Sequence, residues 1–273
     1  MKQGFQRRRT GCRAAGWLFS ALVAFPINAR CGAPFETDDP GTVAPAHAEA
    51  LLFYQNTLGA AGRTGVSPGL ESHFGVLEGI EVDVTTPLAF STATGASSQW
   101  GYGDTTLGLK WRLVKGSEDS PLVSLVPRFT IPTGNSDKGL GNGGSQVFLA
   151  LAAQKSAGGF QTYGNAGYWI NNGPDNRNYW FVGGQTQYRF SDHWIIGAEI
   201  FHTTSQTQGQ PASTGFNVGG YCVFDPHRQL LFSAGRGLQN AAETNRVSVY
   251  LGFQISFWRE SSGPLSLLGP RPP

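Results

Sequence analysis

The feature that most constrains this chain is a strictly alternating stretch near its C-terminus, Val247 to Trp258, with the sequence VSVYLGFQISFW. In an extended strand, one face of this stretch carries only apolar side chains: Val247, Val249, Leu251, Phe253, Ile255 and Phe257. The other face carries Ser248, Tyr250, Gly252, Gln254 and Ser256. The length matches the ~9–11 residues with which a tilted strand crosses a bilayer. Because the backbone polar groups of a membrane strand must all be paired, the stretch predicts a closed β-barrel.

Composition agrees with a barrel of this kind. Charged residues make up 14% of the 273-residue chain, whereas soluble domains contain about 25%. Hydrophobic residues make up 40%, and outside residues 14–29 no apolar run is long enough for a spanning helix. Low charge without long apolar runs is typical of strands that alternate lipid-facing and lumen-facing residues. The net charge of +2 gives no reason to expect a nucleic-acid partner.

The N-terminus is typical of a secretory signal peptide. A basic start precedes an apolar stretch, Gly16 to Ile27, and cleavage is expected after Ala29 or Ala33. A lipoprotein signal at Cys31 is the alternative. The chain then divides into four expected parts: a signal peptide at 1–33, a periplasmic segment leading into the barrel at 34–46, the barrel at 47–258, and a disordered C-terminal tail at 259–273.

About twelve strand-like segments fill the barrel region, so we expect an all-β, antiparallel, up-and-down transmembrane barrel. The connections between them alternate between long and short. Long loops on one rim and short turns on the other are typical of bacterial outer-membrane barrels, whereas a soluble β-sandwich has no reason to sort its loops in this way. The long connections are expected at Gly59–Pro68, Ser91–Gly101, Thr133–Gly144, Asn171–Arg177, Ser205–Ser213 and Leu238–Asn245.

Aromatic residues cluster where the predicted strands meet the two rims. Two aromatic belts are expected at the two water–lipid boundaries of a membrane barrel. Those next to long loops are Trp100, Tyr102, Trp169, Tyr179 and Trp180, and those on the short-turn side or at the chain end are Phe190, Trp194, Phe224 and Trp258.

Three motifs carry a resemblance to a known family: Thr37–Thr42 (TDDPGT), Gly101–Asp104 (GYGD) followed by TTLGLKWR, and Pro127–Gly134 (PRFTIPTG). With them, the chain from Pro34 to Trp258 resembles the outer-membrane transporter family associated with the meta-pathway of phenol degradation. The last strand is also similar to the barrel-assembly signal of outer-membrane proteins, with Tyr250, Gly252, Ile255 and Phe257 in the matching spacing. The resemblance implies a transporter of the bacterial outer membrane, surrounded by outer-membrane lipid and inserted by the barrel-assembly machinery.

The same alternation places charged residues on the inward face of the predicted strands. A three-residue hairpin loop is expected at Leu77–Gly79, with Gly79 in the left-handed conformation. In that register Val76 faces Ile80, Gly75 faces Glu81, and His73 faces Asp83. Acids then gather on the first three strands and bases on the next two, with Arg189 and Glu199 farther round on neighbouring strands. The candidate pore-lining residues are Glu49, Glu71, His73, Glu81, Asp83, Lys110, Arg112, Arg128, Gln187, Arg189 and Glu199.

Two interpretations of these inward charges stay open. An acidic wall facing a basic wall across a narrow, water-filled constriction would select solutes. A salt-bridge network would instead fill a narrow barrel and seal it, because charges in a dry lumen must be paired. The segment Thr37–Thr42 is expected to be a turn-like anchor, and a plug folded into the barrel from the periplasmic side is the alternative.

Two other patterns are interpreted without a chemical role. Gly139, Gly141 and Gly144 satisfy GxGxxG, but a strand-like sequence follows where a nucleotide site needs a helix, so we expect a glycine-rich outer loop. The oxygens of Asn135, Asp137 and Asn142 could bind calcium, although an ordinary solvated loop is favoured.

Catalysis is not expected. His202 and Thr204 share a face, but threonine is a poor nucleophile and the sequence offers no third partner. No cofactor or metal is expected either. The chain is therefore predicted to be a passive barrel for small-molecule solutes, with aromatic or otherwise hydrophobic molecules suggested by the family resemblance. The alternatives are a structural barrel with a sealed lumen and an outer-membrane lipid-modifying enzyme.

Overall fold

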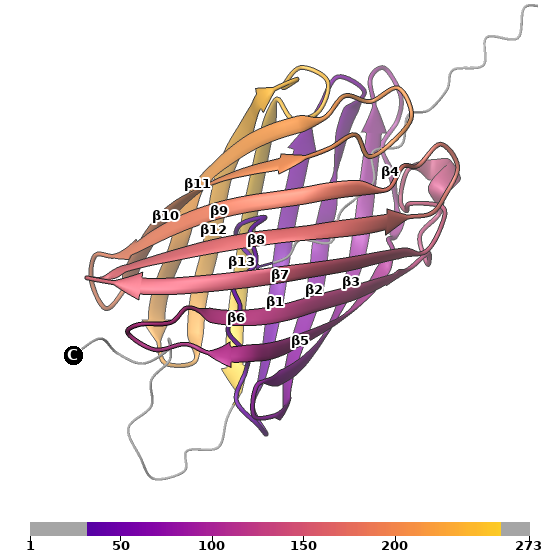
Figure 1. Ribbon diagram of the computed structural model, residues 1–273. Helices are drawn as coiled ribbons and strands as arrows, with labels where there is room; N and C mark the ends of the chain where they lie inside the picture. Colours follow the sequence, from indigo (N-terminus) through magenta and orange to yellow (C-terminus); the bar gives the residue numbers. More distant parts are fainter. Residues whose placement is uncertain (1–31, 258–273) are drawn as a thin grey trace, which may run out of the picture.

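The computed structural model describes residues 32–257, so nearly all of the predicted signal peptide and the whole predicted tail lie outside the described residues. The described chain forms a closed antiparallel β-barrel (Figure 1). Successive strands pair with each other, and the first pairs with the last, as predicted. The strands are β1 (Ala48–Leu58), β2 (Gly62–Leu77), β3 (Ile80–Ala93), β4 (Gln99–Tyr102), β5 (Thr105–Lys115), β6 (Leu122–Ile131), β7 (Gln146–Ala157), β8 (Phe160–Asn171), β9 (Tyr179–Arg189), β10 (Trp194–Thr203), β11 (Ser213–Asp225), β12 (Arg228–Gln239) and β13 (Val247–Phe257).

The short strand β4 is an addition to a twelve-stranded barrel. Both β4 and β5 pair with β3: β4 with Leu88–Ser91, and β5 with Ile80–Thr85. The chain that follows the predicted loop Ser91–Gly101 is expected to form one strand, but it is interrupted at Gly103 and Asp104. The two pieces occupy one position in the barrel wall, so the predicted number of about twelve strands is confirmed. In the described part of the chain, no helix is long and apolar enough to cross a membrane.

Most connections are sorted by length between the two rims, but 59–61 and the predicted long loop Ser91–Gly101, which is reduced to 94–98, are shorter than the turn 116–121 on the opposite rim. Connections 132–145, 172–178, 204–212 and 240–246 lie on one rim, and the short turns 78–79, 158–159 and 226–227 lie on the other. The predicted long loop Gly59–Pro68 is wrong, because β2 begins at Gly62. A register shift between Val66 and Gly69 accommodates Pro68 within the strand, and bulges are where a sheet tolerates proline.

The hairpin between β2 and β3 is nearly as predicted. His73 faces Asp83 and Gly75 faces Glu81. The pair that closes the hairpin is Leu77–Ile80, so the predicted Val76–Ile80 pair is wrong. A bulge between Gly75 and Leu77 absorbs the extra residue, and the turn needs only two residues. The second of them, Gly79, has a φ of 76° and supplies the predicted left-handed conformation.

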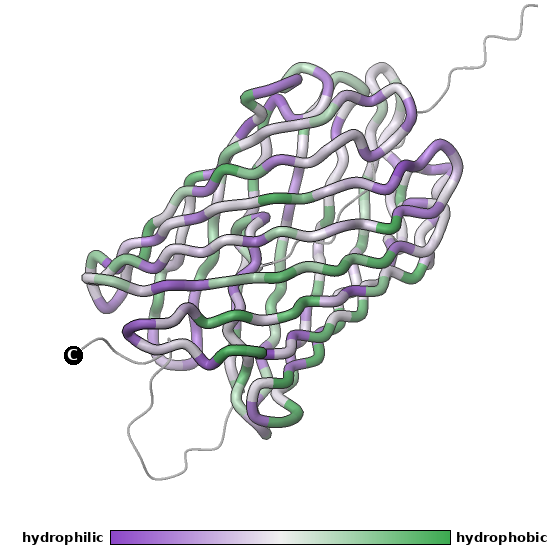
Figure 2. Tube along the Cα trace, in the orientation of Figure 1, coloured by the Kyte–Doolittle hydropathy of each residue, from purple (hydrophilic) through white to green (hydrophobic). Residues whose placement is uncertain are grey.

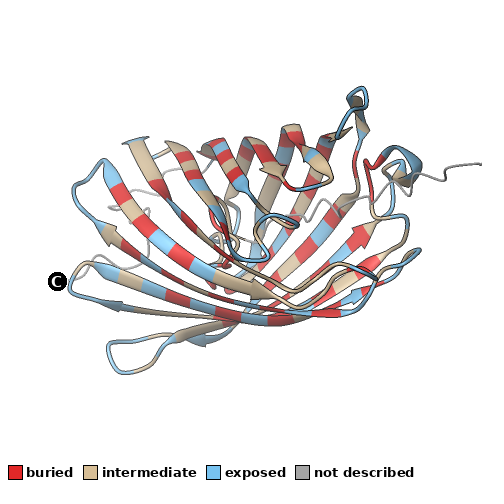
Figure 3. Ribbon diagram, turned by 90° about the horizontal axis from the view of Figure 1, so that it is seen from above, coloured by how far each residue is buried: buried red, intermediate tan, exposed pale blue. Residues whose placement is uncertain are grey.

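The outer surface of the barrel is apolar. Buried and exposed residues alternate along the strands (Figure 3), and hydrophilic residues gather in the loops (Figure 2). In β13, Leu251 is 50% exposed whereas Ser248 and Tyr250 are buried, as predicted. Large hydrophobic side chains exposed on the other strands include Leu52, Leu70, Leu107, Phe129, Leu151, Val182, Ile200 and Val218. Such an exterior is typical of transmembrane β-barrels.

The aromatic belts are confirmed at most of the predicted positions. Trp100, Tyr102 and Trp180 are exposed toward the long-loop rim, and Phe190, Trp194 and Phe224 toward the short-turn rim. The predicted belt position is wrong for two residues: the side chains of Trp169 and Tyr179 are 4% and 1% exposed and point into the barrel. Strand alternation explains both, because their sequence neighbours Ile170 and Trp180 occupy the outward face. Trp258 lies outside the described residues.

Replacing Leu251 with arginine tests whether this surface faces lipid. A charge at the bilayer midplane should destabilise the barrel by about 2–4 kcal/mol, falling to about 0–1 kcal/mol near the interface. We therefore expect Leu251→Arg to shift guanidinium unfolding in lipid vesicles strongly and Leu77→Arg, beside a turn, only slightly. Equal shifts for the two variants would contradict a membrane-facing β13.

Candidate functional site in the barrel lumen

The chain segment that precedes β1 lies inside the barrel (indigo in Figure 1). We call residues 32–46 the plug segment. Phe35 is completely buried, and Thr37 and Asp38 are almost so. A turn does form at the start of the segment, where the Phe35 N–H donates to the Gly32 carbonyl at 3.1 Å. The segment as a whole nevertheless occupies the lumen. Its position therefore matches the alternative prediction of a plug and not the favoured prediction of a turn-like anchor.

One end of the plug segment is bonded to β10, β11 and β12. Glu199 accepts hydrogen bonds from the backbone N–H groups of Glu36 and Thr37, at 2.7 and 2.8 Å, and from the side-chain amide of Asn217 at 2.6 Å. The hydroxyl of Ser233 donates to the Pro34 carbonyl at 2.6 Å. The Glu199 carboxylate therefore serves as the acceptor for backbone donors that strand pairing cannot satisfy.

The middle of the plug segment is bonded to β5 and β6. Arg128 donates from Nη2 to Asp38 Oδ2 at 2.7 Å. Lys110 Nζ lies 3.9 Å from Asp38 Oδ1 and 4.0 Å from Asp39 Oδ2. The hydroxyl of Ser124 donates to the Pro40 carbonyl at 2.6 Å. The inward bases thus meet carboxylates of the plug segment.

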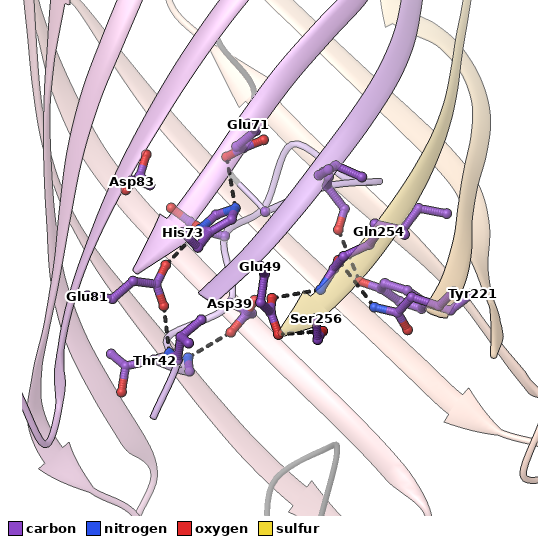
Figure 4. Close-up of a pocket in the computed structure, with 18 of the residues that line it drawn as sticks. Asp39, Thr42, Glu49, Glu71, His73, Glu81, Asp83, Tyr221, Gln254 and Ser256 are labelled. Atoms are coloured by element: carbon purple, nitrogen blue, oxygen red, sulfur yellow. Dashed lines mark hydrogen bonds and ion pairs between the residues drawn. The ribbon is translucent and has the colours of Figure 1, made fainter. Parts of the chain in front are cut away.

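The end of the plug segment nearest β1 is bonded to β3. Glu81 accepts a hydrogen bond from the Val43 N–H at 2.7 Å, and its other oxygen lies 2.8 Å from Nδ1 of His73. His73 Nε2 is 3.4 Å from Glu71. Figure 4 shows this chain of contacts. The plug segment is therefore tied to three parts of the barrel wall.

Two glycines make room for the plug segment. A Cβ atom on Gly75 would lie 2.0 Å from the Ala44 carbonyl oxygen, and one on Gly183 would lie 2.4 Å from Thr37 Oγ1. Both distances are far below any van der Waals contact. These strand positions thus need glycine because another piece of the chain passes directly over them.

Most of the predicted pore-lining residues point inward. Glu49 accepts hydrogen bonds from Gln254 at 2.7 Å and Ser256 at 3.1 Å. Gln187 is buried, with Nε2 3.5 Å from the Tyr221 hydroxyl. Asp83 is 3% exposed, and its Oδ1 has no hydrogen-bond partner among the described residues.

Arg112 and Arg189 lie elsewhere. Arg112 pairs with Glu78 of the β2–β3 turn. Arg189 is exposed at the end of β9, and the residue opposite Glu199 on that strand is Gln185. The structure therefore does not bring Arg189 and Glu199 together.

Aromatic side chains that were not predicted to face the lumen form a cluster in its outer half. One cluster contains Phe148, Trp169, Tyr179 and Phe181. The rings of Phe148 and Trp169 stack with centroids 4.6 Å apart, and those of Trp169 and Tyr179 with centroids 5.8 Å apart. Their alternation with lipid-facing residues is the signal that could have identified them, since Trp169 and Ile170 cannot both face outward.

A cavity of about 330 Å³ remains beside the plug segment. Its lining includes Glu71, His73 and Asp83 from one wall, Tyr163 and Tyr221 from another, and residues of the β11–β12 turn such as Pro226 (Figure 4). That turn belongs to the short-turn rim, which is the periplasmic one in outer-membrane barrels. We call this cavity the periplasmic chamber.

The glycine-rich outer loop is built around Asp104. This carboxylate accepts hydrogen bonds from the N–H groups of Gly134 and Asn142, at 2.9 and 2.6 Å. Asn135, one of the candidate calcium ligands, caps a short 3₁₀ helix, η1 (Ser136–Lys138), by accepting from the Lys138 N–H. Between residues 32 and 257, no group of three or more His, Cys, Asp or Glu residues is arranged to hold a metal ion. The GxGxxG pattern thus serves the packing of this loop.

His202 and Thr204, which the sequence does not favour as a catalytic pair, are bonded to different partners. Nδ1 of His202 lies 2.8 Å from the hydroxyl oxygen of Thr214, and the hydroxyl oxygen of Thr204 accepts from the Trp180 N–H at 2.9 Å. Each side chain is thus engaged with a different strand.

Comparisons with known proteins agree with this architecture. The family described as "Putative MetA-pathway of phenol degradation" matches residues 58–257. The fold is similar to the COG4313 outer membrane channel from Pseudomonas putida F1, with 18% identity, a TM-score of 0.61, and coverage of 80% of this chain and 98% of that one. It is also similar to the KdgM porin (12% identity, TM-score 0.54, 77% and 99%) and the NanC porin (8%, 0.52, 78% and 100%). No curated protein matches the sequence.

Replacing Glu199 with glutamine tests how the plug segment is held. Glutamine has one acceptor oxygen in place of two, and hydrogen bonds to a charged group are worth about 1.5–3 kcal/mol each. We expect the end of the plug segment near Glu36 to detach, so that single channels in planar bilayers show more frequent high-conductance states. Glu243→Gln on an outer loop removes the same charge and should leave the recordings unchanged. A Glu199→Gln channel that behaves like the parent would contradict this role for Glu199.

Proposed function

The chain belongs to the family described as "Putative MetA-pathway of phenol degradation", and from this premise we propose that it is a passive channel of the bacterial outer membrane that the plug segment closes. The apolar exterior, the two aromatic belts and a fold shared with outer-membrane channels place it in that membrane. A solute would cross through the lumen, and the plug segment would have to move aside for it.

The observation that carries this proposal is the way the plug segment is held. Its contacts to the wall are mainly hydrogen bonds and ion pairs, from Glu199, Arg128 and Glu81. Water can replace each of these contacts when the segment moves, so the net free energy lost per hydrogen bond to a charged group is only about 1.5–3 kcal/mol. A segment bonded in this way can be displaced without unfolding the barrel, whose strand ladders are separate.

The proposed solutes are small molecules with aromatic or otherwise hydrophobic character. The aromatic cluster of Phe148, Trp169, Tyr179 and Phe181 supports this proposal, because flat rings stack favourably on other aromatic rings. The family description, which names phenol degradation, also supports it. We further propose that lipid surrounds the barrel and that the barrel-assembly machinery inserts it, the latter on the assembly-signal spacing in β13.

A structural barrel with a sealed lumen is the second candidate. The dense packing of Phe35 and the aromatic cluster favours it, because these side chains leave little free space in the outer half of the lumen. A channel should become more permeable when the plug segment is removed, whereas a sealed barrel should stay closed.

Deleting residues 34–45 separates the two candidates. If the chain is a channel, proteoliposomes containing the deletion variant should swell in small neutral solutes several times faster than those containing the parent protein, because the hydrogen-bonded obstruction is gone. Heat-modifiability on a gel verifies that the variant barrel is folded. Arg128→Gln, which keeps the segment but removes its ion pair with Asp38, is a milder variant with the same expected direction. A folded deletion variant without measurable flux would support the sealed barrel.

A further inference from the structure

The periplasmic chamber has an excess of negative charge. Seven carboxylate side chains line it, against three lysine or arginine side chains. All three cations already have carboxylate partners. Arg128 and Lys110 meet Asp38 of the plug segment, and Arg228 pairs with Asp225 at 2.5 Å beside the rim. Within residues 32–257, the remaining acids of the wall form no ion pair with a lysine or arginine within 4.0 Å.

Four acids make up this remainder, and one of them, Glu81, is already bonded to His73 and to the Val43 N–H. Glu49 is hydrogen-bonded only to neutral groups, Gln254 and Ser256. Glu71 lies near the His73 ring, which Glu81 also contacts from its other side. Asp83 is the most exceptional: it is 3% exposed, Oδ1 has no hydrogen-bond partner among the described residues, and Figure 4 draws no contact to it.

The residue opposite Asp83 on β2 is His73, and the local backbone shows why Asp83 Oδ1 accepts no hydrogen bond among the described residues. The neighbour of Asp83 on β5 is Gly108, and a Cβ atom there would lie 2.0 Å from Asp83 Oδ2. The carboxylate thus rests over bare backbone, where a larger residue would push it away. An uncompensated buried carboxylate is costly, so such a group needs a positively charged or hydrogen-bond-donating partner. Asp83 and Glu71 both line the chamber, so theirs are the carboxylates that a ligand bound there would meet.

We propose that the periplasmic chamber binds a small organic ammonium ion, with the ammonium group donating to Asp83 and Glu71. Its hydrocarbon part would lie against the apolar and aromatic residues of the same lining, including Leu51, Leu231 and Tyr163. Tyrosine rings favour a nearby cation, and a volume of about 330 Å³ lies at the lower end of the ~300–1,000 Å³ typical of small-molecule sites. This proposal adds a solute class to the proposed function. Passage of the ammonium ion through the barrel rests on that function, whereas its binding in the chamber does not.

Three probes of one shape test the charge requirement. Benzylammonium, benzyl alcohol and benzoate share a ring and differ in charge, and their binding to the detergent-solubilised full-length barrel is measured by calorimetry against detergent alone. Benzylammonium should bind, benzyl alcohol should bind at least about tenfold more weakly because it lacks the charge-assisted hydrogen bond, and benzoate should not bind. Equal affinities for the three probes would overturn the proposal.

Substitutions in the chamber locate the site. Asp83→Asn and Glu71→Gln keep the side-chain shape and should each weaken benzylammonium binding by at least about tenfold. Glu118→Gln, on a turn of the same rim and outside the lining, should have no effect. If Asp83→Asn fails to fold, Glu71→Gln carries the test. Unchanged binding in the folded variants would overturn the proposal.

Flux measurements distinguish a failure of the ammonium site from a failure of the proposed channel. Ammonium binding without any solute flux, even after removal of the plug segment, would leave the site in place and refute the channel. Flux of neutral solutes without ammonium binding would leave the channel in place and refute the site.

Discussion

Everything else in this structure depends on the hydrogen-bonded closure between β1 and β13. The ladder runs without a break from Ala48–Phe257 to Leu58–Val247. Closure satisfies the backbone groups that an open sheet edge would expose to lipid, and this allows the outer surface to be largely apolar. It also fixes the interior, because a barrel of about twelve strands is narrow enough for side chains to occupy much of it. The side chains and chain segments in that limited space therefore decide which solutes can pass.

The two halves of the interior are filled by different means. Toward the long-loop rim, stacked rings such as Phe148 and Trp169 exclude water by apolar packing. Toward the short-turn rim, charged side chains meet the plug segment and border the periplasmic chamber. A molecule with an aromatic part and a polar or charged group would find a suitable surface in each half. This division connects the proposed channel to the proposed ammonium site.

Features that follow from strand alternation could be predicted from the sequence. Features that depend on contacts between residues far apart in the sequence could not. Alternation in β13 identifies the lipid-facing Leu251 from a dozen consecutive residues, and the same periodicity turns Lys110 and Glu81 inward. It could not place Trp169 by residue type alone, since aromatic residues suit both the interface and the lumen. The sequence around Pro68 is typical of a loop, but a bulge accommodates this proline within β2. The plug position of Thr37–Thr42 could be offered only as an alternative, because the contacts that hold the segment are distant in sequence: Glu36 and its acceptor Glu199 are 163 positions apart.

The plug segment combines a polar attachment with a small apolar one, and the balance between them bears on how it can move. Burying Phe35 completely contributes about 1.5–3 kcal/mol, whereas the polar contacts to Glu199 and Ser233 exchange with water on release. The segment is also continuous with β1, and the Ala46 N–H donates to the Gly75 carbonyl at the junction. Its far end, at Ala33–Thr37, can therefore detach from β10–β12 while the near end stays on the wall. Such a release clears the side of the lumen below the aromatic cluster, and only the Phe35 site must then be refilled by water or solute.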